Sequence, residues 1–275
     1  MKEAGASLLA TPVSRAFDEL APRYDREWTD SAIGRLQRKA VWRLLDRVFA
    51  PGDHILDLGC GTGVDAVYLA RKGMTVQAID VSPAMVTIAQ GRAENEGLSD
   101  RLTTQVLGIE DLECLQGPCS FDGVLSNFSP LNCVADLRPA AAQLSRLVRP
   151  GGRLVFCMMT RFCLWETFSY LWRGSLRKAT RRWREACSEA RVGAGENFPV
   201  YYWPACDVAS ALAPGFRLVS REGAGIFVPP SHMGPVMGRF HRLLGVLESI
   251  DRIVGRWPGL RSMGDHSLLV FERCS

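Results

Sequence analysis

The sequence predicts an α/β fold with a mostly parallel β-sheet that carries helices on both faces. Two observations predict it. Short apolar segments alternate with amphipathic segments of roughly ten residues as far as Thr160, and glycine or proline separates them. The segment 153–159 is almost wholly apolar, as strands buried on both faces are.

Length and composition limit the possible classes of protein. The chain has 275 residues, 47% of them hydrophobic and 23% charged, which is a globular composition and excludes a disordered chain. No apolar run reaches the ~18 residues of a membrane span, and the N-terminal residues lack the apolar core of a secretory signal. We expect a single domain over residues 1–275.

The elements follow in order. Apolar residues at spacings of three and four predict helices over 14–50, which Pro51-Gly52 ends. The core over 51–160 is predicted to contain strands at 54–58, 74–79, 102–107, 121–126 and 153–159, with helices at 64–72, 82–95 and 139–148. Residues 161–205 and 229–262 are predicted to be helical insertions, because 161–192 and 233–257 have helical periodicity. Strands over 216–228 and 267–271 complete the sheet.

The first strand runs into a glycine-rich turn, Asp57-Leu58-Gly59-Cys60-Gly61-Thr62-Gly63. Glycines at 59, 61 and 63 allow a tight turn and a close approach of a ligand that a Cβ would prevent. Such a turn at the carboxyl end of the first strand predicts a cofactor site. Asp57 and the G-x-G-x-G spacing disfavour a dinucleotide, whose turn has the spacing G-x-G-x-x-G. Asp80 ends the second strand, where a carboxylate can accept both hydroxyls of a ribose.

Four ordered segments, 57–63, Asp80, Phe121-Asp122 and Pro150-Gly151-Gly152, closely resemble those of class I S-adenosylmethionine-dependent methyltransferases. The opening Phe17-Asp18-x-x-Ala21-x-x-Tyr24-Asp25 is similar to that of the ubiquinone/menaquinone-biosynthesis branch and related small-molecule enzymes. The resemblance covers residues 14–160 well and the rest in outline. It implies a Rossmann-like, doubly wound sheet of seven strands, the last one antiparallel, and S-adenosylmethionine as the cofactor.

The resemblance also implies roles for single residues. Gly59 and Gly61 would approach the methionine part of the cofactor, and Asp57 would order that part through its ammonium or a water. Val81 and Met85 would pack on the adenine, and the backbone of Ile109 would contact it. At the family's position for an acid that binds the adenine amino group this chain has Gly108, so Glu110 or Asp111 is expected to substitute, with solvated acids as the alternative. The predicted cofactor-binding residues are Tyr24, Asp57, Gly59, Cys60, Gly61, Gly63, Asp80, Val81, Met85, Ile109, Glu110 and Asn127.

The family's strand order implies where the methyl acceptor binds. The segments 127–129, 159–161, 228–232 and 265–266 would all meet at the cofactor's methyl group. Methyl transfer needs a positioned nucleophile, exclusion of water and, if the nucleophile carries a proton, a base. His232 and His266 fall at this edge and are the candidate bases, because an imidazole pKa of about 6.5 suits that role. The alternative is a loop histidine bonded to the backbone.

Aromatic residues of the insertions predict an apolar wall for an aromatic or lipidic substrate, with core packing as the alternative for at least half of them. No metal site is expected. The predicted substrate-binding residues are Phe128, Thr160, Trp165, Tyr201 and Tyr202.

The net charge of +4 is concentrated in one segment. The window 173–191 has seven basic residues and two acids, so it carries +5 and the rest of the chain −1. A solvated helix face is the simplest explanation. Because aromatic residues precede it, peripheral contact of 165–191 with an anionic membrane surface, or an acidic substrate, is the alternative. Nucleic acid is less favoured, since Asn127-Phe128-Ser129-Pro130 departs from the Asn/Asp-Pro-Pro-aromatic motif of enzymes that methylate exocyclic base amines.

The sequence thus predicts an enzyme that transfers a methyl group from S-adenosylmethionine to a small, partly apolar or aromatic molecule by in-line displacement. The rival functions are a nicotinamide-dependent reductase on a related sheet and a non-catalytic cofactor-binding protein whose basic segment docks to a partner. Nine cysteines without a C-x-x-C pair favour reduced thiols and a cytoplasmic location. The acceptor atom and the oligomeric state stay open.

Overall fold

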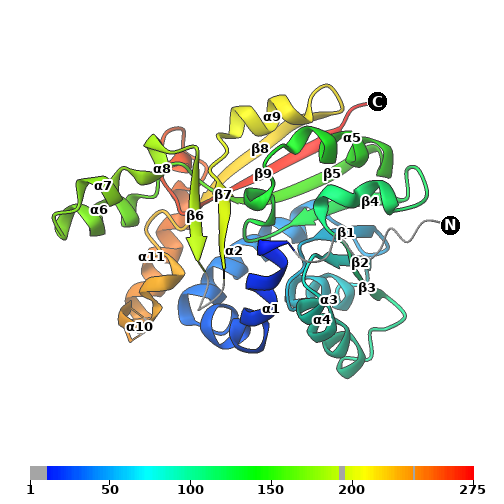
Figure 1. Ribbon diagram of the computed structural model, residues 1–275, viewed down its shortest axis with the longest axis horizontal. Helices are drawn as coiled ribbons and strands as arrows, with labels where there is room; N and C mark the ends of the chain where they lie inside the picture. The colour runs from blue at the N-terminus through cyan, green and yellow to red at the C-terminus, as the bar shows by residue number, and fades with distance from the viewer. Residues whose placement is uncertain (1–10, 192–195, 238) are drawn as a thin grey trace.

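A seven-stranded sheet forms the centre of the computed structural model, which describes residues 11–191, 196–237 and 239–275 (Figure 1). Its strands are β1 (His54–Leu58), β2 (Thr75–Asp80), β3 (Leu102–Val106), β4 (Phe121–Ser126), β5 (Val148–Met159), β8 (Phe216–Ala224) and β9 (His266–Arg273). The order is β3-β2-β1-β4-β5-β9-β8, and β9 is antiparallel to both of its neighbours. The other pairs are parallel. The predicted Rossmann-like sheet is therefore confirmed.

Helices cover both faces of the sheet (Figure 1). On one face lie α2 (Ala32–Val48), α3 (Val64–Arg71) and α4 (Pro83–Asn95); on the other lie α5 (Leu137–Leu147), α9 (Ala205–Leu212) and the short η2 (Ile109–Cys114). Successive residues of β5 serve the two cores, because side chains alternate along a strand. Val155 packs in the core with α2 and α3, and Phe156 packs in the core with α5 and α9.

The N-terminal segment folds into two capped helices, as predicted. α1 (Pro12–Tyr24) begins with the Thr11 hydroxyl accepting the Ser14 N–H at 3.1 Å, and a π-helical turn, η1 (Asp25–Thr29), follows it. α2 begins with the Ser31 hydroxyl accepting the Gly34 N–H at 2.9 Å. Side-chain caps of this kind satisfy donors that the first turn of a helix leaves without partners.

The expectation of a wholly helical insertion over 161–205 is wrong. The segment forms α6 (Leu164–Trp172), α7 (Leu176–Ala179) and α8 (Arg181–Arg184), and then an antiparallel hairpin of β6 (Cys187–Arg191) and β7 (Asn197–Tyr201). Gly174, with φ of +70°, follows the end of α6. β7 buries alternate residues, Phe198 and Val200, against α1, which is strand periodicity. The basic residues are therefore divided among short elements and do not share one helix face.

Two further boundaries differ from the prediction. The strand expected over 216–228 ends at Ala224, because Gly225 has φ of +67° and the N–H groups of Ile226, Phe227 and Val228 donate to the Asp251 carboxylate. The helix expected over 233–257 consists of α10 (Gly234–Met237) and α11 (His241–Val254). The short helices η3 (Pro130–Cys133), η4 (Ser231–Met233) and η5 (Leu260–Ser262) complete the elements.

The strand directions position the site. The parallel strands β1, β2, β4, β5 and β8 all end at one edge of the sheet, where antiparallel β9 begins, and His266 pairs with Met159 and Ala224 there. Among the residues that the structure describes, no helix is long and apolar enough to cross a membrane.

Candidate active site

The glycine-rich turn lies against the end of β2. The N–H groups of Gly59 and Cys60 both donate to the Ile79 carbonyl, at 2.8 and 2.9 Å. Gly61 has φ of +53°, and a Cβ added to it would meet no atom within 4 Å, because it would project into open space. A Cβ on Gly63 would lie 2.7 Å from the Ala89 Cβ, so Gly63 permits close packing of α3 on α4. The turn thus holds one glycine suited to a ligand and one that serves packing.

Asp80 links this turn to the start of α4. Its carboxylate accepts the Gly61 N–H at 2.8 Å and the Ser82 N–H at 2.9 Å. Burial raises the pKa of Asp80 to about 6, although the backbone N–H groups of Ser82 and Gly61 favour the charged form. Asp80 therefore binds a proton at a higher pH than an ordinary carboxyl group does.

A cavity of about 370 Å³, which we call the first cavity, opens above the turn. Nine of the predicted cofactor-binding residues line it: Tyr24, Gly59, Gly61, Asp80, Val81, Met85, Ile109, Glu110 and Asn127. Asp57 and Cys60 line a side cavity of about 20 Å³, to which Tyr24, Gly59, Gly61 and Asn127 also contribute. Gly63 lines neither cavity, in keeping with its packing role.

The opening motif of the chain closes one side of the first cavity. Asp18 accepts the Ser82 hydroxyl at 2.5 Å and the Ala84 N–H at 3.0 Å, which fixes α1 on the start of α4. Asp25 accepts the Thr62 hydroxyl at 2.7 Å and pairs with Arg92. These two acids hold α1 and η1 over the turn, and Phe17 and Tyr24, which directly precede them, line the cavity.

Asp57 is a buried acid with few partners that could stabilise its charge. Its side chain is 1% exposed, and its Oδ2 has no hydrogen-bond partner among the described residues. Burial raises the pKa of Asp57 well above its usual range; the nearby acids Asp65 and Asp80 act in the same direction, and Arg38 opposes them. A buried acceptor without a partner costs free energy, so this oxygen fits a ligand or water that donates a hydrogen bond.

Sequence reasoning missed the buried ion pair beneath the cavities. The Asp65 carboxylate pairs with Arg38 and accepts from Trp42 Nε1 at 2.7 Å and Asn127 Nδ2 at 2.8 Å. The Arg38 guanidinium lies over the Phe128 ring at 4.8 Å. Asp65 occupies the first turn of α3, a common place for an acid, and that position alone gave no signal of its partners.

A second cavity, of about 300 Å³, adjoins the first and shares Phe17, Tyr24, Phe128, Ser129 and Cys133 with it. Its wall is mixed in character. The apolar side chains in it come from Leu20, Trp28, Met159, Phe198 and Val200, and the polar ones include Gln37, Arg38, Arg182, Asp265 and His266. The buried donors Gln37 Nε2 and Arg182 Nε have no hydrogen-bond partner within the described residues. The second cavity therefore suits a partly apolar molecule with hydrogen-bond acceptors.

The structure places one candidate base in the second cavity. His266 is buried, its Nδ1 lies 3.4 Å from Asp265 Oδ2, and its ring meets the Phe128 ring edge-on at 5.6 Å. Burial lowers the pKa of His266, with Arg182 acting in the same direction and Asp265 opposing both, which favours the neutral imidazole. His232 lies in η4 beside Ser231, which lines the second cavity; the His232 side chain lies outside the described structure.

The predicted substrate-binding residues have different surroundings. Phe128 lines both cavities, but the other four line neither. The Thr160 hydroxyl donates to Phe162 and Gly264 carbonyls, and Trp165 Nε1 donates to the Phe227 carbonyl at 2.7 Å. The remaining two pack within the insertion: the Tyr202 hydroxyl accepts from Ser188 at 3.1 Å and Tyr201 stacks on Trp203. These contacts lie within the 161–205 insertion or join it and the end of β5 to the loops after β8 and before β9.

Part of the chain is similar to known proteins. Residues 55–152 match the methyltransferase-domain family. The demethylmenaquinone methyltransferase of Tropheryma whipplei (strain Twist) is 33% identical over 150 residues, which cover 53% of this chain and 58% of the relative. The tRNA 5-carboxymethoxyuridine methyltransferase of Escherichia coli (strain K12) is 32% identical over 145 residues, which cover 51% and 54%. The chain thus spans little more than half the length of these relatives.

A solved structure extends the likeness to the whole fold. The 1,6-didemethyltoxoflavin-N1-methyltransferase of Burkholderia thailandensis, with bound 1,6-didemethyltoxoflavin and S-adenosylhomocysteine, superposes with a TM-score of 0.57 at 16% identity. The match covers 100% of this chain and 94% of that one.

Sheet order, glycine turn and domain match together show a methyltransferase domain on a Rossmann-like sheet, matched over residues 55–152. Its similarity to the T. whipplei protein confirms the resemblance to the ubiquinone/menaquinone-biosynthesis type that the opening motif indicated.

Proposed function

We propose that the protein transfers a methyl group from S-adenosylmethionine, bound in the first cavity, to a small, partly apolar molecule bound in the second. The observation that carries this proposal is the contact between the two cavities: five residues line both, so ligands in them would meet. A volume of about 300 Å³ lies at the lower end of the range of small-molecule sites.

The residues of the first cavity fit the cofactor. Asp80 would accept the ribose hydroxyls, Asp57 Oδ2 would accept from the ammonium or a water, and the open space beside Gly61 would admit the methionine part. Val81, Met85 and Ile109 offer an apolar surface for the adenine. When bound, the cofactor supplies a methyl carbon that its sulfonium already activates. The protein's part is to orient the acceptor and to exclude water.

His266 is the base that we propose for an acceptor that carries a proton. It is buried in the second cavity, and its neutral imidazole can take a proton from a bound hydroxyl or amine. Asp265, 3.4 Å from Nδ1, would orient the ring and stabilise the charged form. The insertions 161–205 and 229–262 would cover this cavity as a lid over the core.

Cofactor binding followed by product analysis tests the proposal. Titration calorimetry with S-adenosylhomocysteine and with NADH comes first, and the reductase alternative requires that NADH binds. Metabolite extracts are then incubated with the protein and S-adenosylmethionine labelled at its methyl group, and products are identified by mass spectrometry. A labelled small molecule is expected. Binding of S-adenosylhomocysteine without any labelled product would favour the non-catalytic alternative.

We also propose that the segment 165–191 touches an anionic membrane surface. Trp172, Leu176 and Phe168 are 83%, 69% and 60% exposed, although large apolar side chains are usually covered. Arg177 and Lys178 are exposed on α7. Figure 1 shows α6 and α7 projecting from one end of the molecule, away from the sheet. Aromatic side chains beside cations suit the boundary of an anionic bilayer.

The charge available to a membrane is smaller than the sequence indicates. Arg182 is buried and pairs with Glu166 and Asp265, and Arg181 also pairs with Glu166.

Flotation with anionic vesicles should recover the wild type, and W172A/L176A should lose recovery. I253A/W257A is the matched control, because it removes exposed apolar side chains from α11 and from the residues just after it. Equal recovery with neutral and anionic vesicles would contradict membrane contact.

A cytoplasmic location is part of the proposal. All nine cysteines are free thiols in the structure, which suits a reducing compartment. Counting alkylated cysteines by mass spectrometry, in protein isolated in the presence of an alkylating agent, tests it, and a stable disulfide would contradict it.

A further inference from the structure

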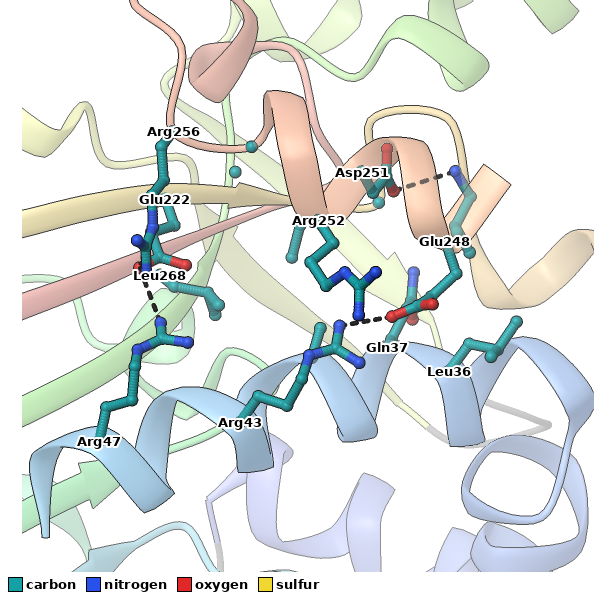
Figure 2. Close-up of a pocket in the computed structure, with 16 residues that line it drawn as sticks. Leu36, Gln37, Arg43, Arg47, Glu222, Glu248, Asp251, Arg252, Arg256 and Leu268 are labelled. Atoms are coloured by element: carbon teal, nitrogen blue, oxygen red, sulfur yellow. Dashed lines mark hydrogen bonds and ion pairs between the residues drawn. The ribbon is translucent and has the colours of Figure 1, made fainter. Parts of the chain in front are cut away.

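A third cavity, of about 320 Å³, lies between α2, β8 and α11 (Figure 2). Four arginines line it: Arg43 and Arg47 from α2, and Arg252 and Arg256 from or just after α11. Gln37 lines both this third cavity and the second cavity. The proposed methyl transfer uses none of these arginines.

Asp251, one of three acids in the wall, forms no ion pair with the four arginines. Its Oδ2 accepts the N–H groups of Ile226 and Val228, both at 3.1 Å, and its Oδ1 accepts that of Phe227 at 2.7 Å. These bonds hold the loop after β8, and they occupy both oxygens of the carboxylate.

The other two acids pair with arginines, and the wall keeps a net positive charge. Glu222 Oε1 lies 2.8 Å from a terminal nitrogen of both Arg47 and Arg256, so two guanidiniums share one carboxylate. Glu248 Oε1 pairs with Arg43 at 2.5 Å. Arg252 makes no hydrogen bond or ion pair with any residue that the structure describes, and Figure 2 shows its guanidinium pointing toward the Arg43–Glu248 pair.

We propose that this third cavity binds an oxyanion of the phosphate class, as the phosphate group of a small molecule or of a lipid. Guanidiniums offer several N–H donors in a planar fork that matches the oxygens of a phosphate. Arg252 and the guanidiniums shared on Glu222 provide the N–H donors for such an anion, and four arginines against three acids leave the wall with a net positive charge. The volume exceeds that of a phosphate alone and lies in the range of small-molecule sites.

The test is titration calorimetry of the full chain with pyrophosphate. Saturable binding is expected in the wild type, weakened at least about tenfold in R252A, because one charge-assisted contact is removed. R242A is the matched control: Arg242 is also exposed on α11 but does not line the cavity, so its affinity should equal that of the wild type. R177A/K178A controls for the basic segment and should also bind normally.

R252A should keep the wild-type unfolding midpoint, because Arg252 is exposed. An absence of saturable binding, equal affinity in R252A, or loss of binding in R177A/K178A would each overturn the proposal. Vesicles containing phosphatidic acid distinguish the two sources. If R252A reduces the recovery of the protein with these vesicles, the site binds a lipid phosphate. If recovery is the same in R252A and the wild type, the site binds a free phosphorylated molecule.

Discussion

Asp80 is the residue on which cofactor binding should depend most directly. It lines the first cavity and is fixed by two backbone N–H groups, so its orientation is set before a ligand arrives. We expect D80A to weaken S-adenosylhomocysteine binding more than tenfold, because a charged acceptor of two hydrogen bonds is lost. Titration calorimetry measures this, with D80N as the variant of similar shape. Unchanged affinity in D80A would refute the ribose assignment.

The same carboxyl group predicts a pH dependence. Its pKa of about 6 is above the usual value, so the group binds a proton as the pH falls through about 6. The protonated carboxyl group is the poorer acceptor. Cofactor affinity should therefore decrease as the pH falls from 7.5, about 1.5 units above that pKa, to 5.5, about 0.5 units below it. Affinity measured across this range should fall for the wild type. D80N should bind weakly and with little pH dependence.

His266 should affect turnover and leave cofactor binding alone. It lies in the second cavity and does not line the first. With the acceptor identified by labelling, H266Q should lower kcat about 100-fold or more and remove the acidic limb of the pH–rate profile, while S-adenosylhomocysteine affinity stays constant. H232Q tests the second candidate in the same way. His241, exposed on α11, provides the control H241Q. Full activity in both H266Q and H232Q would mean that neither histidine is a base.

At the scale of elements, the glycine turn combines two functions that substitution can separate. G63A should lower the free energy of unfolding by about 2 kcal/mol, because its Cβ would press on Ala89 at 2.7 Å. G61A should lower it less and weaken S-adenosylhomocysteine binding more, because its Cβ enters open space beside the cofactor. Denaturant unfolding and calorimetry on both variants measure the two effects. Equal losses of stability and affinity in both variants would contradict this division.

Elements with a local cause were predictable from the sequence. The turn at 57–63 is specified by its glycines, and α4 by the Ser82 cap and Pro83. The insertion after Thr160 was not predictable in the same way. Helical spacing among its aromatic and basic residues suggested one helix, but Gly174 separates α6 from α7 and the β6–β7 hairpin depends on burial of Phe198 against α1. Contacts between residues about 180 positions apart cannot be recognised in a single sequence.

At the scale of the whole molecule, Asp65 joins three elements around the site. It pairs with Arg38 of α2 from its place in α3, and it holds Asn127 just beyond β4. D65A should destabilise the protein by about 3–5 kcal/mol, because it leaves the buried Arg38 without its partner. D46A is the control: Asp46 is 41% exposed and binds Lys72 and Tyr68, so its loss should cost at most about 1 kcal/mol. Denaturant unfolding of both variants measures the difference, and equal costs would contradict the role of Asp65.

The two cavities differ in how far the sequence predicted their linings. Most of the predicted cofactor residues line the first cavity, because a glycine turn and strand-end acids are local motifs with a fixed place in this sheet. The second cavity is built from α1, α2, β7 and the start of β9, which are far apart in the chain. Of the predicted site residues with described side chains, Tyr24, Phe128 and His266 line it, and the sheet order placed the last two there.

The position of β9 has a consequence for the synthesis of the chain. β9 lies between β5 and β8 and bonds to both, although residues 266–273 are the last part of the sheet to be made. Until they emerge from the ribosome, β5 and β8 present unpaired edges, which invite pairing with other chains. A nascent chain interrupted before residue 266 would therefore be both inactive and prone to aggregation.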